Sequence, residues 1–269
     1  MSKPRTLVLT GYGINCDEET RFAFELAGAD AVIVHINDII EDPSMLDRYQ
    51  ILSFPGGFSY GDDTGSGKAL ANRIKNNLLD ELQRFIHRDT LVLGICNGFQ
   101  VMVNLGIVPA LRSSLGEAEA ALIHNTSFRY GCRWVDLKIE SASPSVFTMD
   151  IETLHIPVAH GEGNFYAPEH VLRELEASNR VTMRYCNPDG TAAAGEFPFN
   201  PNGSLDEIAA VCDNTGRLMG MMPHPERGMF FSQRDDWTHL RETNRRKGTS
   251  TPEFSDGFAI FTNAIFYFS

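Results

Sequence analysis

Short apolar runs and amphipathic stretches alternate along the first part of the chain. Runs of four to six apolar residues bounded by glycine, proline or polar residues are typical of buried strands. They predict strands at residues 6–9, 31–36 and 51–54, and another in the run that begins at Leu91. Residues 68–88 instead repeat apolar side chains every four positions, which predicts an amphipathic helix. This alternation favours βαβ units and a parallel sheet.

A helix is also expected after the first strand. Asn15 and Glu18 have the spacing of a capping box, and Gly28 stands near the expected end of the helix. Phe22 and Leu26, together with Ala23 and Ala27, are expected on its buried face.

The second half of the chain has a different pattern. Residues 132–139 alternate apolar and polar side chains, as a strand with one exposed face does. Further strands are predicted at residues 156–159, 181–186, 208–212 and 218–222. Residues 187–205 are rich in glycine, proline and asparagine and predict a loop, while residues 232–251 predict a charged, exposed insertion. Aromatic residues three to four positions apart predict a closing helix between Phe254 and Phe268.

These elements together predict an α/β fold. We expect a three-layer, doubly wound, mostly parallel sheet with helices on both faces, extended by antiparallel strands in the second half. The chain shows no internal repeat and no linker, so we expect a single domain over residues 1–269.

Composition narrows the choice of partner and compartment. The formal charge of −12 disfavours nucleic acid as a partner, because binding phosphates requires a basic face. The five cysteines are an odd number without paired spacing, which favours a protein in a reducing compartment. The N-terminus leads directly into a predicted strand and lacks the apolar region of a signal peptide. We therefore expect a cytoplasmic protein without a membrane span. Without a Cys-x₂₋₄-Cys pair, we expect no metal site. Cys132, Cys186 and Cys212 fall in predicted strands and are expected in the core.

The run that begins at Leu91 leads into a cysteine between two glycines. Gly94, Cys96 and Gly98 form Gly-x-Cys-x-Gly, the thiol version of the nucleophile elbow. Such a turn would place Cys96 at a helix N-terminus, whose free N–H groups favour a thiolate and a developing oxyanion. The alternatives are a buried core cysteine and a membrane span over the uncharged residues 90–111. The glycines and polar residues of this stretch disfavour both.

A base for that cysteine is available later in the chain. His224 and Glu226 stand two residues apart just after a predicted strand, so a carboxylate could orient the imidazole.

Two other glycine-rich stretches do not match the motifs of nucleotide-binding sites. Cys16 replaces the third glycine of a dinucleotide fingerprint, and residues 61–69 have the wrong spacing for a phosphate loop.

These motifs resemble the class I (triad) glutamine amidotransferases, whose sheet is flavodoxin-like. The resemblance is carried by residues 94–100, the Gly56-Gly57 pair and His224-Pro225-Glu226. Five further segments are similar to the members that serve purine biosynthesis; they are residues 13–17, 55–62, 125–127, 160–163 and 222–227.

The resemblance implies a role for each site residue. Cys96 would attack the side-chain amide of glutamine, His224 would transfer protons, and Glu226 would orient His224. The backbone N–H groups of Gly57 and Asn97 would form the oxyanion hole. The residues expected to contact glutamine are Gln100, His160, Gly161 and Gly163.

The resemblance also implies partners. Ammonia would pass to a separate synthetase subunit that uses ATP and Mg²⁺ to make formylglycinamidine ribonucleotide, and a small third subunit often bridges the two. This chain would need no cofactor of its own. Phe99, where a small residue is common, and the polar residues 61–68 depart from the family pattern. The alternatives are a glutaminase for another synthetase, a γ-glutamyl hydrolase, or a non-catalytic regulatory subunit with a relic triad.

Overall fold

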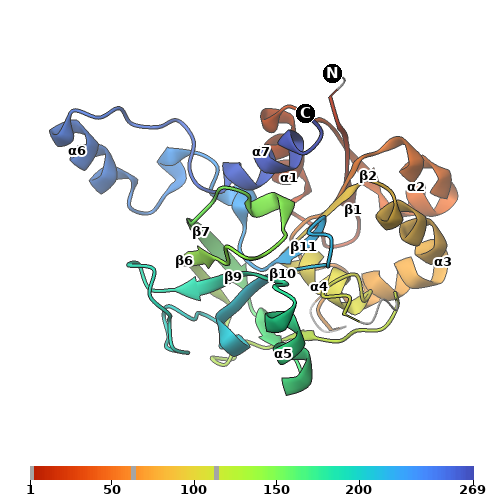
Figure 1. Ribbon diagram of the computed structural model, residues 1–269. Helices are drawn as coiled ribbons and strands as arrows, with labels where there is room; N and C mark the ends of the chain where they lie inside the picture. Colours follow the sequence, from red (N-terminus) through yellow and green to blue (C-terminus); the bar gives the residue numbers. More distant parts are fainter. Residues whose placement is uncertain (1–2, 62–64, 112–114) are drawn as a thin grey trace.

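The computed structural model describes residues 3–61, 65–111 and 115–269, and a nine-stranded sheet forms its centre (Figure 1). The strand order is β2-β1-β3-β4-β11-β10-β9-β6-β7. The first five strands of this order are mutually parallel, and each later pairing is antiparallel. The parallel part has the 2-1-3-4-5 order of flavodoxin-like sheets. The predicted fold class, including the added antiparallel strands, is therefore confirmed.

The elements have the following bounds. The strands are β1 (Arg5–Thr10), β2 (Asp30–His35), β3 (Ile51–Phe54), β4 (Leu91–Ile95), β5 (Ala121–Ile123), β6 (Gly131–Ile139), β7 (Thr153–His160), β8 (Asn164–Tyr166), β9 (Val181–Cys186), β10 (Ile208–Cys212) and β11 (Leu218–Met221). The α-helices are α1 (Asp17–Ala27), α2 (Ile36–Glu41), α3 (Lys68–His87), α4 (Asn97–Asn104), α5 (Glu169–Ala177), α6 (Trp237–Lys247) and α7 (Phe258–Phe266). The short 3₁₀ helices include η1 (Pro43–Arg48), η5 (Pro225–Arg227) and η6 (Phe231–Gln233).

Helices cover both faces of the parallel strands, as predicted. Helices α1 and α7 pack together on one face, where the rings of Phe24 and Phe261 meet edge to face at 5.0 Å (Figure 1). Helices α3 and α4 pack on the other face. The central strands β3 and β4 are buried along their whole length because both of their faces are covered.

The first helix corrects two predictions made from the sequence. Helix α1 begins at Asp17 with Cys16 at its N-cap position and no capping hydrogen bond from a side chain, so the capping box of Asn15 and Glu18 does not form. Phe22 and Leu26 are exposed, and the buried residues are Thr20, Ala23 and Phe24. The prediction is therefore confirmed for Ala23 and wrong for the two large side chains. Gly28 does end the helix, with a left-handed φ of 111°.

The two irregular segments differ from each other. Residues 187–204 contain no helix or strand, as predicted. The insertion after residue 231 is exposed as predicted, but it carries helix α6, which projects away from the sheet (Figure 1). No helix within the described ranges is long and apolar enough to cross a bilayer. The single domain over residues 1–269 stays a prediction.

Candidate active site

The carboxyl ends of three neighbouring parallel strands bring the predicted catalytic residues together. Strand β4 pairs with β3 on one side and with β11 on the other, and the register aligns Gly94 with Phe54 and with Gly220. Gly57 follows β3, Cys96 follows β4, and His224 follows β11. Residues far apart in the sequence therefore meet at the edge where open α/β sheets bind ligands.

Cys96 has the strained backbone that defines a nucleophile elbow. Its φ of 52° and ψ of −108° lie outside the regions that non-glycine residues usually occupy. The flanking glycines are required by packing, because a Cβ on Gly98 would overlap the carbonyl oxygen of Phe54, and one on Gly94 would overlap Met102. Cys96 is 5% exposed, and its Sγ donates to the carbonyl oxygen of Ala159 at 3.7 Å.

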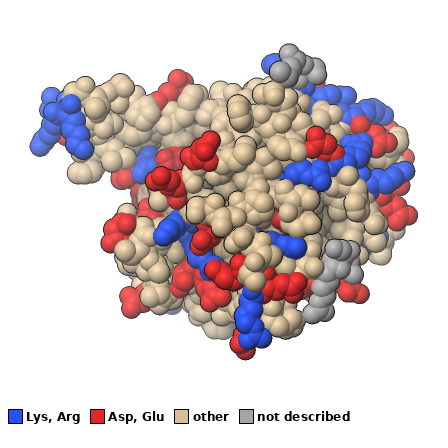
Figure 2. All heavy atoms as spheres, in the orientation of Figure 1, with Lys and Arg blue, Asp and Glu red and all other residues tan. Residues whose placement is uncertain are grey.

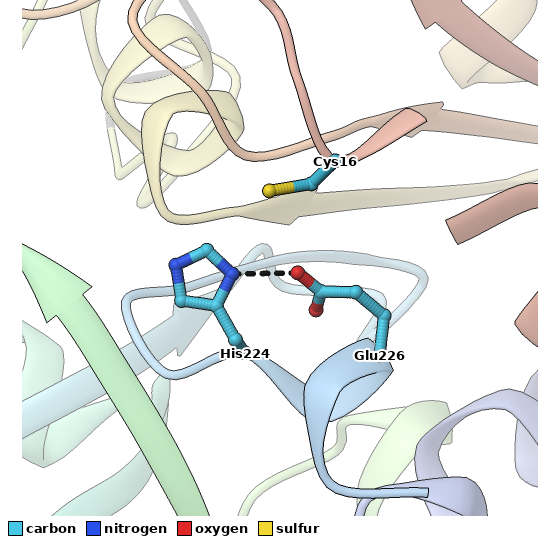
Figure 3. A group of neighbouring side chains, drawn as sticks. All are labelled: Cys16, His224 and Glu226. Atoms are coloured by element: carbon cyan, nitrogen blue, oxygen red, sulfur yellow. Dashed lines mark hydrogen bonds and ion pairs between the residues drawn. The ribbon is translucent and has the colours of Figure 1, made fainter. Parts of the chain in front are cut away.

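His224 and Glu226 form a buried pair directly after β11. Nδ1 of His224 lies 2.6 Å from Oε1 of Glu226, and both side chains are almost inaccessible to solvent (Figure 3). Within the described part of the chain, Nε2 of His224 is buried without a hydrogen-bond partner. The Nδ1 contact thus leaves the opposite nitrogen free for proton transfer, as the triad template requires.

The surroundings of His224 favour its protonated form. Burial is the largest single influence and lowers the pKa of His224, but the negative charge of Glu226 and the thiols of Cys96 and Cys16 outweigh it. The net result is a pKa of His224 well above 6.5. An imidazolium held by Glu226 beside Cys96 suits a base that must later return a proton.

The two predicted oxyanion-hole donors lie in the loop after β3 and at the start of α4. Gly57 has a φ of +148°, and a Cβ there would lie 2.7 Å from the carbonyl oxygen of Gly13. Asn97 is the first residue of α4, where a backbone N–H has no acceptor within the helix. The Asn97 side chain also joins the two loops, because its Oδ1 accepts from the backbone N–H of Ser59 at 3.1 Å.

A narrow cleft opens at the nucleophile. Its lining residues are Gly57, Phe58, Ser66, Cys96, Gln100, Ala159, His160, Gly161 and Glu162. Gln100 uses both ends of its amide inside the protein: Nε2 donates to the carbonyl of Glu162 at 2.5 Å, and Oε1 accepts from Asn97 at 2.8 Å. Gln100 therefore supports the cleft wall, and its contact with glutamine stays a prediction.

The loop of residues 160–163 is split between the cleft and the interior. His160 and Gly161 line the cleft, while Gly163 lies against the imidazole of His160, which a Cβ at this position would overlap. Burial, with a smaller influence from His224, lowers the pKa of His160 to about 3, so its imidazole is neutral. Contact of these residues with glutamine stays a prediction.

Asn125 is a supporting residue whose role the sequence did not reveal. It is buried, and its Oδ1 accepts from the backbone N–H of Gly163 at 3.1 Å and lies 3.2 Å from Nδ1 of His160. Its Nδ2 donates to the carbonyl of His160 at 2.9 Å. The motif at residues 125–127 was the only signal available, and it does not specify a contact with a loop that lies 35 residues away in the sequence.

Cys16 is a second residue whose position the sequence did not reveal. It is fully buried, and its Sγ lies beside His224 and Glu226 (Figure 3). Three such donor types can hold a metal ion, but the guanidinium of Arg227 donates to this sulfur at 2.9 Å and opposes a cation. Of the other cysteines, Cys186 and Cys212 are buried as predicted, whereas Cys132 is exposed near the start of β6, where the strand pairs with β7 but not with β9.

One sequence motif lies partly outside the described residues. The segment 55–62 ends at Asp62, and the polar stretch 61–68 includes residues 62–64, for which the structure gives no description. Phe99, the other departure from the family pattern, is fully buried and stacks on Phe165 with ring centroids 6.3 Å apart.

Comparison with known proteins agrees with this geometry. A family model described as a CobB/CobQ-like glutamine amidotransferase domain matches residues 3–268. A protein of Methanococcus maripaludis named phosphoribosylformylglycinamidine synthase subunit PurQ is 50% identical, with 99% of this chain and 98% of that protein covered. A protein of the same name from Dehalococcoides mccartyi is 42% identical, with 98% of each covered.

A solved structure described as PurLQS from Thermotoga maritima superposes with a TM-score of 0.71 at 29% identity and covers both chains completely. Full-length similarity of this degree, together with the family model over nearly all residues, shows that the chain belongs to the PurQ family of phosphoribosylformylglycinamidine synthase subunits, which are glutamine amidotransferases.

Proposed function

We propose that this chain is the glutaminase subunit of phosphoribosylformylglycinamidine synthase. It hydrolyses glutamine through a thioester on Cys96 and passes ammonia to a synthetase subunit that makes formylglycinamidine ribonucleotide. The observation that supports this most is the meeting of an elbow cysteine with a buried His224–Glu226 pair at one sheet edge. The full-length similarity to PurQ proteins supports the choice of synthetase.

The first half of the reaction releases ammonia. Sγ of Cys96 attacks the side-chain carbonyl carbon of glutamine, and His224 holds the thiol proton. The backbone N–H groups of Gly57 and Asn97 stabilise the resulting oxyanion, where one such donor is worth about 3 kcal/mol. When the tetrahedral intermediate collapses, the C–N bond breaks, His224 gives its proton to the departing nitrogen, and a γ-glutamyl thioester remains.

The second half of the reaction restores the thiol. His224, now neutral, takes a proton from water while the water oxygen bonds to the thioester carbon. The C–S bond then breaks, glutamate leaves, and the proton returns to the sulfur. Glu226 holds Nδ1 of His224 throughout, so that Nε2 faces the reacting atoms.

The test is glutamate release by the complex. The chain is mixed with the synthetase subunit, the small third subunit, glutamine, ATP with Mg²⁺, and formylglycinamide ribonucleotide. We expect the partner subunits to stimulate glutamate release strongly and Cys96→Ala to abolish it. If the partners have no effect, the purine assignment is wrong. If Cys96→Ala retains activity, the thioester mechanism is wrong.

The same mixture distinguishes the competing functions. A γ-glutamyl hydrolase would act at full rate without the synthetase, and a regulatory subunit would release no glutamate in any mixture. ATP is assigned to the synthetase subunit, so omitting it should stop amidine formation even when free ammonia replaces glutamine.

All five cysteines are unpaired in the structure, which supports a reducing compartment such as the cytoplasm.

A further inference from the structure

The loop between β1 and α1 places a second sulfur next to the catalytic base. Cys16 is 0% exposed and occupies the N-cap position of α1. Donor atoms of Cys16, His224 and Glu226 all lie within 4.8 Å of one another, and Figure 3 shows Sγ pointing toward the imidazole. The mechanism described above assigns no role to this residue.

The position of Cys16 is set by the loop that carries the oxyanion donor. The backbone N–H groups of Asn15 and Cys16 both donate to the carbonyl of Gly56, at 3.3 and 3.2 Å. The backbone N–H of Phe58 donates back to the carbonyl of Gly13 at 2.7 Å. The loop that carries Cys16 is thus fastened to the segment that contains Gly57.

Gly56 makes room for both side chains. A Cβ at this position would lie 2.7 Å from Cε1 of His224 and 3.2 Å from Sγ of Cys16. The imidazole edge and the sulfur therefore rest against the same glycine. A shift of the Gly56 backbone would disturb the base and the oxyanion donor together.

The sulfur is also hydrogen-bonded on its other sides. Nη2 of Arg227 donates to Sγ of Cys16 at 2.9 Å, and Sγ donates to Oδ1 of Asn15 at 3.3 Å. Nε of the same Arg227 lies 3.9 Å from Oε1 of Glu226. Cys16 therefore holds the guanidinium beside the carboxylate that orients His224.

We propose that Cys16 is a positioning residue of the glutaminase site. It holds Arg227 and the edge of the His224 imidazole, so that His224 stays aligned with the segment that contains Gly57. This inference rests on the proposed function. The sulfur is not a second nucleophile, because it is fully buried and does not line the cleft at Cys96.

The groups that face His224 determine what a pH measurement would show. They are the carboxylate of Glu226, the thiols of Cys96 and Cys16, the guanidinium of Arg227 behind them, the neutral His160 and the phenol of Tyr130. Contact with Cys16 is among the influences that raise the pKa of His224. Removing the sulfur should therefore make His224 lose its proton at lower pH.

The first experiment measures turnover in the assembled complex. Cys16→Ala should lower kcat by about tenfold, the effect expected when one hydrogen-bonded contact is lost, with little change in the KM for glutamine. The alkaline limb of the kcat–pH profile should move to lower pH, and Cys16→Ser should recover part of both effects. Cys212→Ala is the matched control, since Cys212 is equally buried but lies in β10, and it should behave as the unmodified chain.

The second experiment does not depend on glutaminase activity. The rate at which iodoacetamide alkylates Cys96 is followed across pH in the isolated chain, with mass spectrometry to identify the modified cysteine. This rate reports on the Cys96–His224 pair whether or not glutamine is the substrate. Cys16→Ala should shift the pH dependence of alkylation, and Cys212→Ala should not.

The third experiment tests whether Cys16 acts through Arg227. Cys16→Ala should lower kcat by less in the Arg227→Met background than in the unmodified chain, because the contact between the two side chains is already lost and only the contact of Cys16 with His224 remains to be removed. If Cys16→Ala does not fold, Cys16→Ser and Arg227→Met are compared in the same assays. An unchanged pH dependence of alkylation in the folded variants, or a loss of kcat that only follows the folded fraction, would overturn the proposal. A failure of the partners to stimulate the unmodified chain would instead refute the proposed function.

Discussion

At the scale of single residues, the site depends on a strained cysteine. A non-glycine residue in an unusual backbone conformation costs on the order of 1–3 kcal/mol, which the surrounding structure must offset. Both backbone polar groups of Cys96 are hydrogen-bonded: its N–H donates to the carbonyl of Met221 at 2.7 Å, and its carbonyl accepts from the N–H of Gln100 at 3.1 Å. The strained geometry projects the thiol from the sheet edge while the backbone stays fully bonded.

The role of Glu226 can be tested by changing its charge without its shape. Glu226→Gln removes the carboxylate that raises the pKa of His224, so the imidazolium should lose its proton at lower pH. We expect kcat to fall about 10²–10⁴-fold and the alkaline limb of the pH profile to move downward. An alkaline limb that stays in place would show that Glu226 does not control His224.

The elbow glycines can be tested through stability. Gly98→Ala places a methyl group against the carbonyl of Phe54, so α4 must move away from β3, and we expect a loss of about 3 kcal/mol of unfolding free energy. Gly190→Ala is the comparison, because Gly190 has a left-handed φ of 80° but open space around it. It should cost only roughly 1 kcal/mol of backbone strain. Urea denaturation of both variants measures the difference, and equal losses would contradict the packing argument.

At the scale of elements, the active site is built from loops that follow adjacent strands. The loops after β1, β3, β4 and β11 carry Cys16, Gly57, Cys96 and His224, and these strands are neighbours in the sheet. The antiparallel strand β7 contributes the opposite wall, since His224 donates its backbone N–H to Pro157 at 2.8 Å. The antiparallel extension therefore helps to form the cleft as well as enlarging the sheet.

The loop of residues 160–163 depends on Asn125. Asn125→Ala would leave the buried carbonyl of His160 and the N–H of Gly163 without this partner, which costs roughly 1–3 kcal/mol per group. We expect a higher KM for glutamine with a smaller effect on kcat, because the loop lines the cleft but does not take part in proton transfer. Steady-state kinetics of the assembled complex measure both, and a KM equal to that of the unmodified chain would exclude this support role.

At the scale of the whole molecule, helix α6 stands apart from the rest. None of its residues is buried, and it carries four basic residues and one acidic residue on a chain with a net charge of −12. Figure 2 shows the basic side chains gathered at its tip. Arg234, just before α6, forms ion pairs with Asp236 at 2.8 Å and with Asp256 at 3.1 Å. These pairs attach the segment that carries α6 to the segment before α7.

Substitutions in helix α6 and at Arg234 should therefore affect stability to different extents. Removing the exposed ion pairs with Arg245→Ala/Arg246→Ala should leave the melting temperature and isolated activity unchanged, because exposed pairs contribute little. Arg234→Ala should lower the melting temperature, because Arg234 is mostly buried and joins the segment that carries α6 to the segment before α7. Thermal denaturation followed by circular dichroism compares the two, and equal melting temperatures would contradict this account.

Local patterns in the sequence were sufficient for the fold class and the candidate triad. Apolar runs predicted β1 and β3 with ends within a residue and β4 with its start at Leu91, because burial on both faces of a strand leaves little freedom of residue type. The four-residue spacing predicted α3 with ends within a residue. Gly94, Gly98 and the His224–Glu226 spacing predicted the chemistry, because a sharp turn and a short-range contact are properties of neighbouring residues. The family was indicated by the resemblance of these motifs, and the comparisons confirm it.

Long-range contacts were decided only by the tertiary structure. Cys16 read as a failed glycine motif and Asn125 as part of a short polar motif, yet each contacts a loop that the sheet order brings beside it. The burial of Phe24 in place of Phe22 was likewise decided by the tertiary structure, because Phe24 packs against Phe261 of α7. Sequence alone determined the candidate catalytic residues, since turn and strand preferences act over a few residues. The structure determined what holds those residues in place, since that support crosses strands far apart in the chain.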